Sequence, residues 1–372
     1  MRWEGKQMAA PRGTLWPRDD HTEGKHLVLK EYLKAWFPIL GKFNGRILFV
    51  DGFAGPGEYA DGEEGSPVVA MRVLADHAAT IRAEVVFVFI EKERMRAEHL
   101  NRLVDRWRPE LPPSAKVHVL EDSFESRMTD VLQALEDQKK RMAPALVMMD
   151  PFGIKDIPLS VIRGILGNRQ CEVYVTFMWE EMNRFFTTSE FEPHMDAMFG
   201  TDAWRRAADM AGSERRRHLY ALYKAQLKSA GAKHVLHFHL YKRNGLKYSV
   251  FFATRHPLGS DRMKKAIWKV APFGGGDFSF RGGNSDQMVM LGVTEPDYTA
   301  LRSALLGRFG DTRWVRIEDI LEFVRSDETM FHDGQVKKPV LKPMEQEGHI
   351  EVNHHRQRRR FTYPAGCRIR FH

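Results

Sequence analysis

Short apolar runs alternate with segments of helical periodicity through the first two-thirds of the chain. The predicted strands are Arg46–Val50, Glu84–Ile90, Lys116–Leu120, Pro144–Met149 and Cys171–Phe177. The predicted helices are Lys25–Pro38, Ser66–His77, Arg94–Trp107, Phe124–Arg141 and Pro158–Leu166. A strand and then a helix, repeated about every 30 residues, predicts parallel strands with right-handed crossovers. Such a doubly wound sheet binds its ligands beyond the carboxyl ends of the strands.

Two further strands complete the predicted sheet. His234–Lys242 and Lys247–Thr254 are close enough along the chain to pair as an antiparallel edge. A long helical stretch, Glu180–Ala230, separates them from the fifth strand, and the glycine-rich segment Phe273–Asn284 is predicted to be a loop. We therefore expect a seven-stranded, Rossmann-like α/β domain over residues 1–294, with a basic helical insertion over residues 180–232.

The pattern changes at about Glu295. Helices are predicted at Tyr298–Phe309, Ile317–Val324 and Gln335–Gln346, and strands at His349–Val352 and Arg360–Phe371. Three helices and a hairpin are typical of a winged helix-turn-helix, here expected over residues 295–372. Pro339 and Pro343 both fall in the third helix, and a proline deep inside a helix costs about 3 kcal/mol or shortens it. Insertion of this helix into a major groove is therefore disfavoured.

Basic and acidic residues are unevenly distributed along the chain. The whole sequence carries 57 basic and 49 acidic residues, a net charge of +8. From Arg205 to Lys269 the local excess is +13, and six arginines but no acid follow Glu351, so the rest of the chain is acidic on balance. Two basic regions on an acidic body predict contact with a polyanion such as DNA or RNA.

The composition also limits where the chain is expected to act. The mean hydropathy is −0.44 and the longest apolar runs are of strand length, which argues against a membrane span. Residues Met1–Arg18 lack an apolar signal segment. The two cysteines, Cys171 and Cys367, provide neither a disulfide framework nor a metal site. We therefore expect a cytoplasmic protein without a metal.

The segment Phe49–Gly57 predicts a ligand site after the first strand. Its glycines let the backbone approach a bulky ligand, although glycines can also serve only to bend a turn. The spacing is not that of a dinucleotide site, and the acid that begins the turn suits an ammonium group such as that of S-adenosylmethionine. The expected cofactor-binding residues in this turn are Asp51, Gly52, Phe53, Ala54, Gly55 and Gly57.

Acidic residues also follow the next two strands. Glu91 can accept both hydroxyls of a ribose, and Asp122, with Ser123 beside it, can reach an adenine amine. Either acid alone is more often a solvated strand end or a helix cap. Three acids after three successive parallel strands predict a nucleoside-bearing cofactor. Lys25, near the start of the first helix, is a further candidate that would meet a carboxylate or phosphate, with a solvated helix start as the alternative.

Asp150, Pro151, Phe152 and Gly153 follow the fourth strand and are the candidate catalytic residues. The carboxylate can accept hydrogen bonds from an exocyclic amine, and the aromatic ring can stack on the base that carries the amine. Backbone carbonyls can help to draw off charge as the nitrogen attacks a methyl group. The alternative is a structural Asp-Pro turn with a buried phenylalanine.

These motifs strongly resemble those of the three-Cys-motif partner protein family (TcmP). The matching stretches are His21–His26 with Tyr32, Leu33 and Trp36, then Asp51–Gly57, Gly65–Pro67, Asp150–Gly153 and Phe177–Phe185. The resemblance covers most of residues 20–350 and implies a class I S-adenosylmethionine-dependent methyltransferase-like fold with a C-terminal winged helix. It also implies a functional partner, a radical-type three-Cys-motif protein encoded nearby. The family name describes that partner, in agreement with the two cysteines of this chain.

Two looser resemblances concern the substrate. The D-P-F-G segment looks like that of tRNA guanine N2-dimethyltransferases, whose Asp and Phe, carried onto Asp150 and Phe152, would hold the target base. Lys25-His26 before a helix is similar to a bacterial ribosomal-RNA adenine-N6 methyltransferase family. That family carries D-P-P-Y instead, which puts adenine as the target in doubt and leaves amino methylation as the expectation.

Three groups of residues are candidates for contact with substrate or nucleic acid. Trp179, Glu180 and Asn183 lie just past the fifth strand, Arg215, Arg216 and Arg217 lie in the insertion, and Lys337, Lys338, Arg356, Arg358 and Arg359 lie in the winged helix. Arginine runs are usually solvated helix faces, and a winged domain can instead bind protein or be structural.

The sequence thus predicts an S-adenosylmethionine-dependent methyltransferase that acts on nucleic acid, at an exocyclic amine of a base. One alternative is a nucleic-acid-binding adaptor that keeps the fold and serves a three-Cys-motif enzyme in modification or repair. Another is a methyltransferase for a small molecule or a protein, in which case the basic insertion would not bind nucleic acid.

Overall fold

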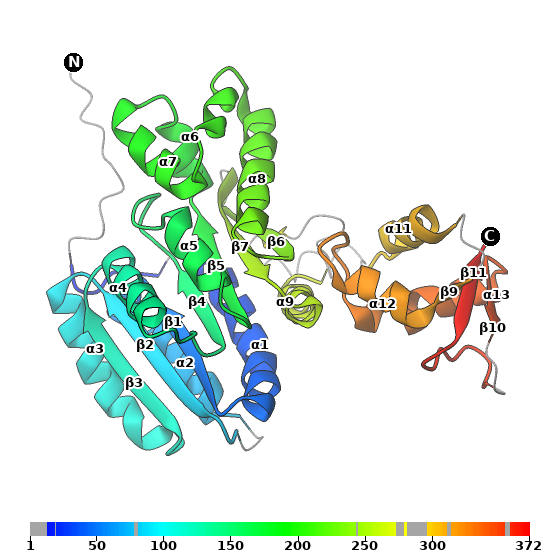
Figure 1. Cartoon of the computed structure of the whole chain (residues 1–372), viewed down its shortest axis with the longest axis horizontal. Helices are drawn as coiled ribbons and strands as arrows, with labels where there is room; N and C mark the ends of the chain where they lie inside the picture. The colour runs from blue at the N-terminus through cyan, green and yellow to red at the C-terminus, as the bar shows by residue number, and fades with distance from the viewer. Residues whose placement is uncertain are drawn as a thin grey trace.

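The structure is a computed structural model of the chain, and it describes residues 13–18, 20–77, 81–242, 245–272, 279–280, 296–310, 314–353 and 358–372. It shows a large α/β body from which a small C-terminal unit projects to one side (Figure 1). The expected boundary at residues 294 and 295 and most of the expected loop Phe273–Asn284 lie outside the described residues.

One mixed sheet of eight strands forms the body, in the order β3-β2-β1-β4-β5-β7-β6-β8. The strands are β1 Arg46–Asp51, β2 Glu84–Glu91, β3 Ala115–Glu121, β4 Ala145–Met149, β5 Cys171–Phe177, β6 His234–Lys242, β7 Gly245–Thr254 and β8 Ser279–Phe280. Strands β1 to β5 run parallel, whereas β7 is antiparallel to both β5 and β6. This order with a reversed β7 is that of the class I methyltransferase sheet, which confirms the predicted fold; β8 adds a short edge.

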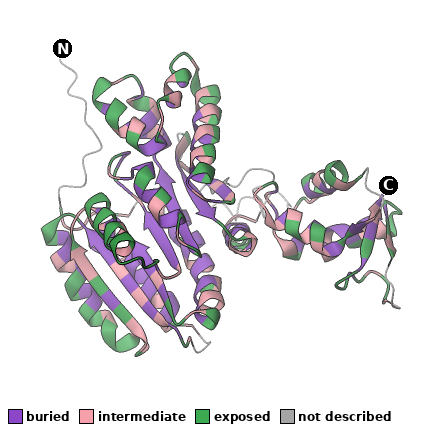
Figure 2. Ribbon diagram, viewed as in Figure 1, coloured by how far each residue is buried: buried purple, intermediate pink, exposed green. Residues whose placement is uncertain are grey.

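Helices cover both faces of the sheet, so its central strands are apolar almost throughout. The helices are α1 Asp20–Phe43, α2 Ser66–Ala75, α3 Arg94–Trp107, α4 Phe124–Asp137, α5 Leu159–Leu166 and α9 Pro257–Val270. Helix α1 packs against α2 and α9, and α4 packs against α5. Every residue of β4 and β5 is buried, and Figure 2 shows the buried sheet between the exposed outer surfaces of the helices. None of the described helices is long and apolar enough to cross a membrane.

The insertion between β5 and β6 is helical, as predicted for Glu180–Ala230, and it is divided into several helices. It consists of α6 Trp179–Arg184, α7 Glu192–Phe199 and α8 Gly212–Ser229, with 3₁₀ turns at Ser189–Phe191 and Ala203–Ala207. Gly200 ends α7 with φ of 63°, a left-handed conformation that a continuing helix cannot contain. Helices α7 and α8 pack against α5 and so build outward from the carboxyl edge of the sheet.

The C-terminal unit has the topology of a winged helix. Its main elements are α11 Thr299–Phe309, β9 Val315–Arg316, α12 Ile317–Arg325, α13 Lys342–Gln346, β10 Ile350–Asn353 and β11 Arg368–Phe371. The strand order is β10-β11-β9, and all pairs are antiparallel. The predicted strand Arg360–Phe371 is wrong in its start, because Gly366 has φ of 81° and the strand begins only at Arg368.

The predicted third helix, Gln335–Gln346, is also interrupted. A 3₁₀ turn at Asp333–Gln335 and a π turn at Lys337–Leu341 precede the short α13. Pro343 lies in the first turn of α13, where its missing N–H costs nothing, so the helix is shortened as the proline predicts. The predicted third helix is therefore present as a helical segment of changing geometry, of which only Lys342–Gln346 is α-helical.

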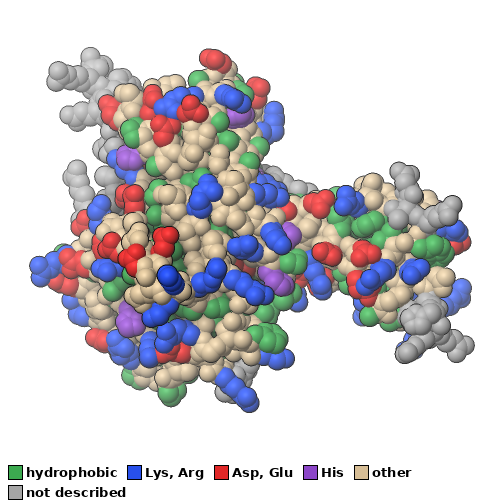
Figure 3. All heavy atoms as spheres, viewed as in Figure 1, with side chains coloured by type: hydrophobic (Ala, Val, Ile, Leu, Met, Phe, Trp, Pro, Cys, Tyr) green, Lys and Arg blue, Asp and Glu red, His purple; other side chains and the backbone are tan. Residues whose placement is uncertain are grey.

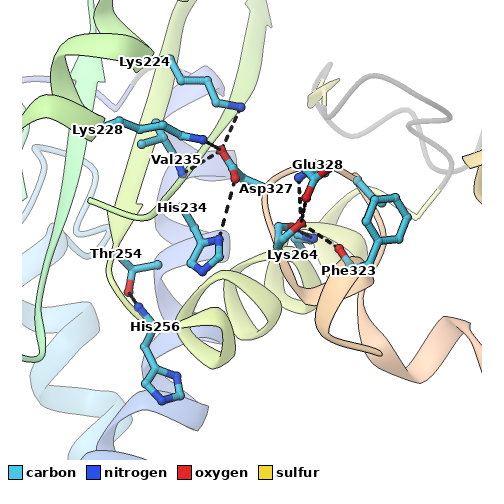
Figure 4. A network of polar contacts seen from close by, with 12 residues as sticks. Lys224, Lys228, His234, Val235, Thr254, His256, Lys264, Phe323, Asp327 and Glu328 are labelled. Carbon is cyan, nitrogen blue, oxygen red and sulfur yellow. Dashed lines mark hydrogen bonds and ion pairs between the residues drawn. The ribbon is translucent and has the colours of Figure 1, made fainter. Parts of the chain in front are cut away.

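Ion pairs and hydrogen bonds fasten the C-terminal unit to the body (Figure 4). The carboxylate of Asp327, just after α12, accepts hydrogen bonds from Lys224 at 3.0 Å and Lys228 at 2.9 Å, both on α8. Burial opposes this charge, but His234 and the two lysines hold the pKa of Asp327 well below its ordinary range. From α9, the fully buried Lys264 ammonium donates to backbone carbonyls at the end of α12 and beyond, those of Val324, Ser326 and Phe331.

Candidate functional site

The turn after β1 forms a backbone cradle at the carboxyl edge of the sheet. Gly55 and Gly57 adopt left-handed φ values of 59° and 84°. A Cβ on Gly57 would lie 2.6 Å from Leu100 on α3, so this glycine is also required for packing. A Cβ on Gly55 would meet only the ring of Trp16, at 3.6 Å, within the described residues. The predicted turn is therefore bent by glycines, and on the side of Gly55 the ring of Trp16 packs over it.

The rest of the turn is anchored by its neighbours. Gly52 is buried against the ring of Phe124, and the Ala54 amide donates to the carbonyl of Ile90 at 3.0 Å. The ring of Phe53 is half-buried and lies 5.6 Å from that of Phe124. These contacts fix the turn between β1 and the start of α4.

Asp51 lies at the base of this turn and is fully buried. Its Oδ1 accepts a hydrogen bond from the Phe53 amide at 3.2 Å, whereas Oδ2 is buried without a partner in the described part of the chain. Burial raises the pKa of Asp51 to about 6, although the Ser66 hydroxyl and the Phe53 amide beside the carboxylate act in the opposite direction. A buried carboxylate oxygen that lacks a donor is the kind of group that pairs with a cationic ligand.

Glu91, at the end of β2, is held against the glycine turn. Its Oε2 accepts from the Gly55 amide at 2.9 Å, and its Oε1 accepts from the Glu93 amide at 2.8 Å. The side chain is buried, and burial raises its pKa. Each carboxylate oxygen retains a lone pair for a further donor. The structure therefore brings Glu91 to the same turn as Asp51, as the sequence predicts.

Asp122 and Ser123 are occupied by local contacts. Asp122 accepts from the Ser123 amide at 2.7 Å and pairs with Arg127 at 3.0 Å. The Ser123 hydroxyl accepts from the Ser126 amide at 3.2 Å and so caps α4. The helix-cap alternative is thus present for Ser123, while Asp122 remains half-exposed at the end of β3.

Lys25 of α1 forms an ion pair with Asp150 after β4. The ammonium is buried and also lies 5.5 Å from the ring centre of Tyr248, so the solvated-helix alternative for Lys25 is wrong. The other oxygen of Asp150 accepts from the Thr176 hydroxyl at 2.6 Å. Burial raises the pKa of Asp150, but Lys25 and Thr176 outweigh it, and the net pKa lies below its ordinary value. Asp150 is thus held as a carboxylate.

His26, beside Lys25, is the neutral neighbour of this pair. Burial and the charge of Lys25 lower its pKa to about 3. Its Nδ1 has no hydrogen-bond partner among the described residues, and its ring lies 6.2 Å from that of Tyr59. The side chain of His21, one turn earlier in α1, is outside the described set.

Phe152 is 44% exposed, so the alternative of a buried phenylalanine is wrong. The ring of Trp16 meets it edge to face at 5.5 Å, and Trp16 also lies 6.1 Å from Tyr59. The Arg96 guanidinium covers both rings, at 4.8 Å from Trp16 and 5.9 Å from Phe152. Sequence reasoning missed Trp16 because it precedes the first periodic segment. The only feature of the sequence that could have indicated Trp16 is that it is an aromatic residue in a segment containing glycine and proline.

The other two residues of the tetrapeptide are packed inward. Pro151 is buried, and Gly153 has φ of 116°. A Cβ on Gly153 would lie 3.1 Å from both carboxylate oxygens of Glu181. Glu181 is buried, its Oε2 has no hydrogen-bond partner within the described set, and burial raises its pKa. The sequence favoured Glu180, which instead pairs with Lys247 at 3.1 Å, because the inward side of the short α6 could not be identified.

Several of the expected substrate residues have structural contacts. Trp179 is buried in the core. The Arg215 guanidinium donates to Asn183 Oδ1 at 3.0 Å and to the carbonyls of Ala207 and Ala208, both at 3.2 Å. Arg215 thereby ties α8 to α6. Arg216 and Arg217 are half-buried and exposed, respectively.

The basic residues of the winged unit likewise include one with structural contacts and others that are exposed. Arg358 pairs with Glu345 and donates to the Thr362 carbonyl at 3.2 Å. Lys338 and Arg359 are exposed, and Lys337 is half-buried. Arg356 lies outside the described residues. Across the described chain, no group of three His, Cys, Asp or Glu side chains is placed to hold a metal ion.

The chain matches no family model, and no curated protein matches its sequence. Among solved structures, Trm1 from Pyrococcus horikoshii with S-adenosyl-L-methionine aligns with a TM-score of 0.41 and 11% identity, over 97% of this chain and 93% of that chain. A Legionella pneumophila protein of family model DUF519 gives 0.40 and 13%, over 68% and 91%. An O-methyltransferase from Bacillus cereus gives 0.32 and 12%, over 64% and 92%. These likenesses are remote, whereas the strand order itself identifies the fold.

Proposed function

We propose that the chain is an S-adenosylmethionine-dependent methyltransferase that acts on nucleic acid, at an exocyclic amine of a base. The observation that carries this proposal is the buried Oδ2 of Asp51, which accepts no hydrogen bond within the described residues, beside the glycine turn at Gly55. This oxygen suits the ammonium of the cofactor, because a buried anionic acceptor gains most from a charged donor. The class I methyltransferase sheet places it at the carboxyl edge, where doubly wound folds bind ligands.

The neighbouring residues fit the remainder of the cofactor. Glu91, held by the Gly55 amide, retains acceptor capacity for the ribose hydroxyls. Asp122 is half-exposed at the end of the next strand and would accept from the adenine amine. Bound S-adenosylmethionine would supply an activated methyl group. The acids after β1, β2 and β3 would fix its position relative to Asp150.

Asp150 and Phe152 would hold the target base. The pKa of Asp150 lies below its ordinary value, so the group accepts hydrogen bonds from an amine rather than donating one. The exposed face of Phe152 supports stacking of a base extruded from its strand. This role is positional and electrostatic: the carboxylate orients the nitrogen and stabilises the positive charge that develops on it.

Nucleic acid would be bound outside this site by exposed cations. Arg217 on α8 and Lys338 and Arg359 in the winged unit are exposed, and Arg216 and Lys337 are partly exposed. Such residues contact phosphates and supply affinity without reading sequence. We assign the methyltransferase-like domain to residues 1–294, with the insertion at 180–232, and the winged helix to residues 295–372.

A second function is an adaptor that serves a radical-type three-Cys-motif protein, the partner that the sequence resemblance implies. This function is favoured because two expected site residues already have hydrogen-bond or ion-pair partners within the protein. Asp122 is paired with Arg127, and both oxygens of Asp150 already accept hydrogen bonds. An adaptor would bind nucleic acid without transferring a methyl group.

Two measurements separate these functions. Isothermal titration with S-adenosylmethionine should show binding by the wild type, and mass spectrometry of nucleosides from cells with and without the chain should reveal a methylated base. Asp150→Asn should abolish transfer and retain cofactor binding. The exposed Asp105→Asn on α3 is the matched control and should change neither. Absence of cofactor binding by the wild type would leave only the adaptor.

A further inference from the structure

We propose that the body carries a second ligand site, for a nucleoside phosphate, at the amino end of the parallel strands. It lies at the opposite end of the sheet from Asp51 and is independent of the proposed methyl transfer. A cleft of about 990 Å³ opens there between the C-terminal half of α1, the start of β5 and the start of α9. Cavities of this size hold organic ligands such as nucleotides.

The rim of the cleft is cationic. Five basic side chains line it: Arg141, Arg169, Lys233, Arg255 and Arg262. Within the described residues, the side chains of Arg141, Arg169 and Lys233 make no hydrogen bond or ion pair, and all three are exposed. Figure 3 shows Lys and Arg side chains across the middle of the body, with Asp and Glu side chains among them. Cations without protein partners around one cavity are the arrangement that binds phosphate.

The oxygens of the carboxylate beneath the cleft are engaged by neutral donors inside the protein, so they leave the basic side chains at the rim unpaired. Glu172 of β5 is buried and accepts from Tyr32 at 2.6 Å, Trp36 at 3.0 Å and Thr254 at 2.7 Å. Burial raises its pKa, the direction expected where negative charge is costly. The cleft therefore presents positive charge at the rim above a closed hydrogen-bond network.

One wall of the cleft is apolar and accessible. Phe43, at the end of α1, is 74% exposed, and Ile39, Leu40 and Leu258 line the cleft beside it. An exposed aromatic ring next to arginines suits a planar, aromatic group linked to phosphate, because the ring can stack on the base. Inorganic phosphate would use only the rim, whereas a nucleotide would use both the rim and the wall. The source of the nucleotide is either a free molecule or the end of a nucleic acid strand.

The test is a set of titrations with adenosine monophosphate, inorganic phosphate and a short 5′-phosphorylated oligonucleotide. We expect the wild type to bind the nucleotide more tightly than phosphate. Combined Arg169→Ala and Lys233→Ala should weaken both ligands at least tenfold, a loss of about 1.4 kcal/mol or more, because two cations no longer contact the phosphate. Phe43→Ala should weaken the nucleotide and leave phosphate unchanged. A preference for the oligonucleotide over the monophosphate would assign the site to a nucleic acid end.

The controls separate this site from the cofactor edge. Arg102→Ala with Arg108→Ala removes two exposed charges from the region of α3 and should leave binding unchanged. Glu91→Gln alters the ribose acceptor at the cofactor edge and should also leave binding of adenosine monophosphate unchanged, whereas a loss would place the nucleotide at that edge. Thermal unfolding checks that every variant is folded. Failure of the wild type to bind any of the three ligands, or equal losses in the rim variant and the α3 control, would overturn the proposal.

Discussion

The Lys25 ammonium donates a hydrogen bond to Asp150 Oδ2 across 125 positions of sequence, joining the first helix to the turn after the fourth strand. The lysine is buried and the carboxylate is partly exposed, with side-chain exposures of 4% and 26%. The pair therefore holds one charge inside the protein and keeps the opposite charge at its surface. Removing either partner leaves the other without compensation.

We expect Lys25→Met to destabilise the protein by about 2–4 kcal/mol, somewhat less than a fully buried pair would lose because Asp150 is partly exposed. Urea unfolding of Lys25→Met, Asp150→Asn and the double variant would measure the coupling. The double variant should be more stable than Lys25→Met, since it no longer contains an unpaired carboxylate. Additive losses would show that the two groups do not depend on each other.

Asp51→Asn should weaken S-adenosylmethionine binding about 10–100-fold, because it removes the charge from a hydrogen bond worth about 1.5–3 kcal/mol. Calorimetric titration measures this directly. The exposed Asp105→Asn is the control and should bind as the wild type does. Equal affinity of the two variants would show that Asp51 does not contact the cofactor.

Cofactor affinity should fall as the pH is lowered through about 6, the pKa of the buried Asp51, because only the carboxylate pairs with an ammonium. Below this pH the loss should approach tenfold per pH unit, and Asp51→Asn should abolish the dependence. The same shift affects stability. The unfolded chain ionises near 3.8 and the folded chain near 6, so the contribution of Asp51 to stability is lost as the pH rises between these values. A titration curve without a break near 6 would contradict this.

Trp16→Ala should reduce methyl transfer about 3–10-fold with little change in cofactor affinity. The reason is the edge-to-face contact of Trp16 with Phe152, since aromatic pairs contribute about 0.5–1.5 kcal/mol. Steady-state kinetics with saturating cofactor would measure the loss. Trp16→Phe, which keeps an aromatic ring, should recover most of the activity. A variant whose cofactor affinity falls as much as its transfer rate would place Trp16 against the cofactor instead.

Arg216→Ala combined with Arg217→Ala should weaken nucleic acid binding and reduce the slope of log affinity against log salt by about 0.9 for each phosphate that the variant no longer neutralises. Fluorescence anisotropy over a salt series measures the slope. The control combines Arg102→Ala on α3 with Arg108→Ala just after it. It removes the same number of charges and should leave the salt slope unchanged. Arg215 is unsuitable for this test because its guanidinium holds the insertion together.

Lys264→Met should loosen the C-terminal unit, because three backbone carbonyls lose a buried donor. We expect a loss of about 2–4 kcal/mol and faster proteolytic cleavage between the two units. Lys265→Met on the same helix is exposed and provides the control. Identical cleavage of the two variants would show that Lys264 does not secure the unit.

The main sheet could be predicted from the sequence because its signal is local. Runs such as Cys171–Phe177 are buried on both faces, so the apolar pattern alone marks them, and His234–Lys242 agrees with the observed strand to the residue. The position of β7 between β5 and β6 was not predictable from this local pattern, since strand order depends on contacts distant in sequence. Helix breaks at Gly200 and the late start of β11 were missed because single glycines and prolines change the backbone without changing hydrophobicity.

The site was predictable to the extent that its residues follow strands. Asp51, Glu91 and Asp150 follow parallel strands, and the sheet brings them to one edge. The partner of Asp150 was harder to find, because Lys25 is joined to it only by the packing of α1. Trp16 and Glu181 have no periodic signal, and the choice between Glu180 and Glu181 depends on how one short helix is rotated.

Asp327 links the C-terminal unit to the helical insertion. The carboxylate lies in the C-terminal unit and pairs with Lys224 and Lys228 of α8, the helix that also carries Arg216 and Arg217. The separation between the insertion and the winged unit is thereby set before any ligand arrives. A nucleic acid that contacts both the insertion and the winged unit would have to extend across this fixed distance. Long strands would then bind more tightly than strands too short to reach both.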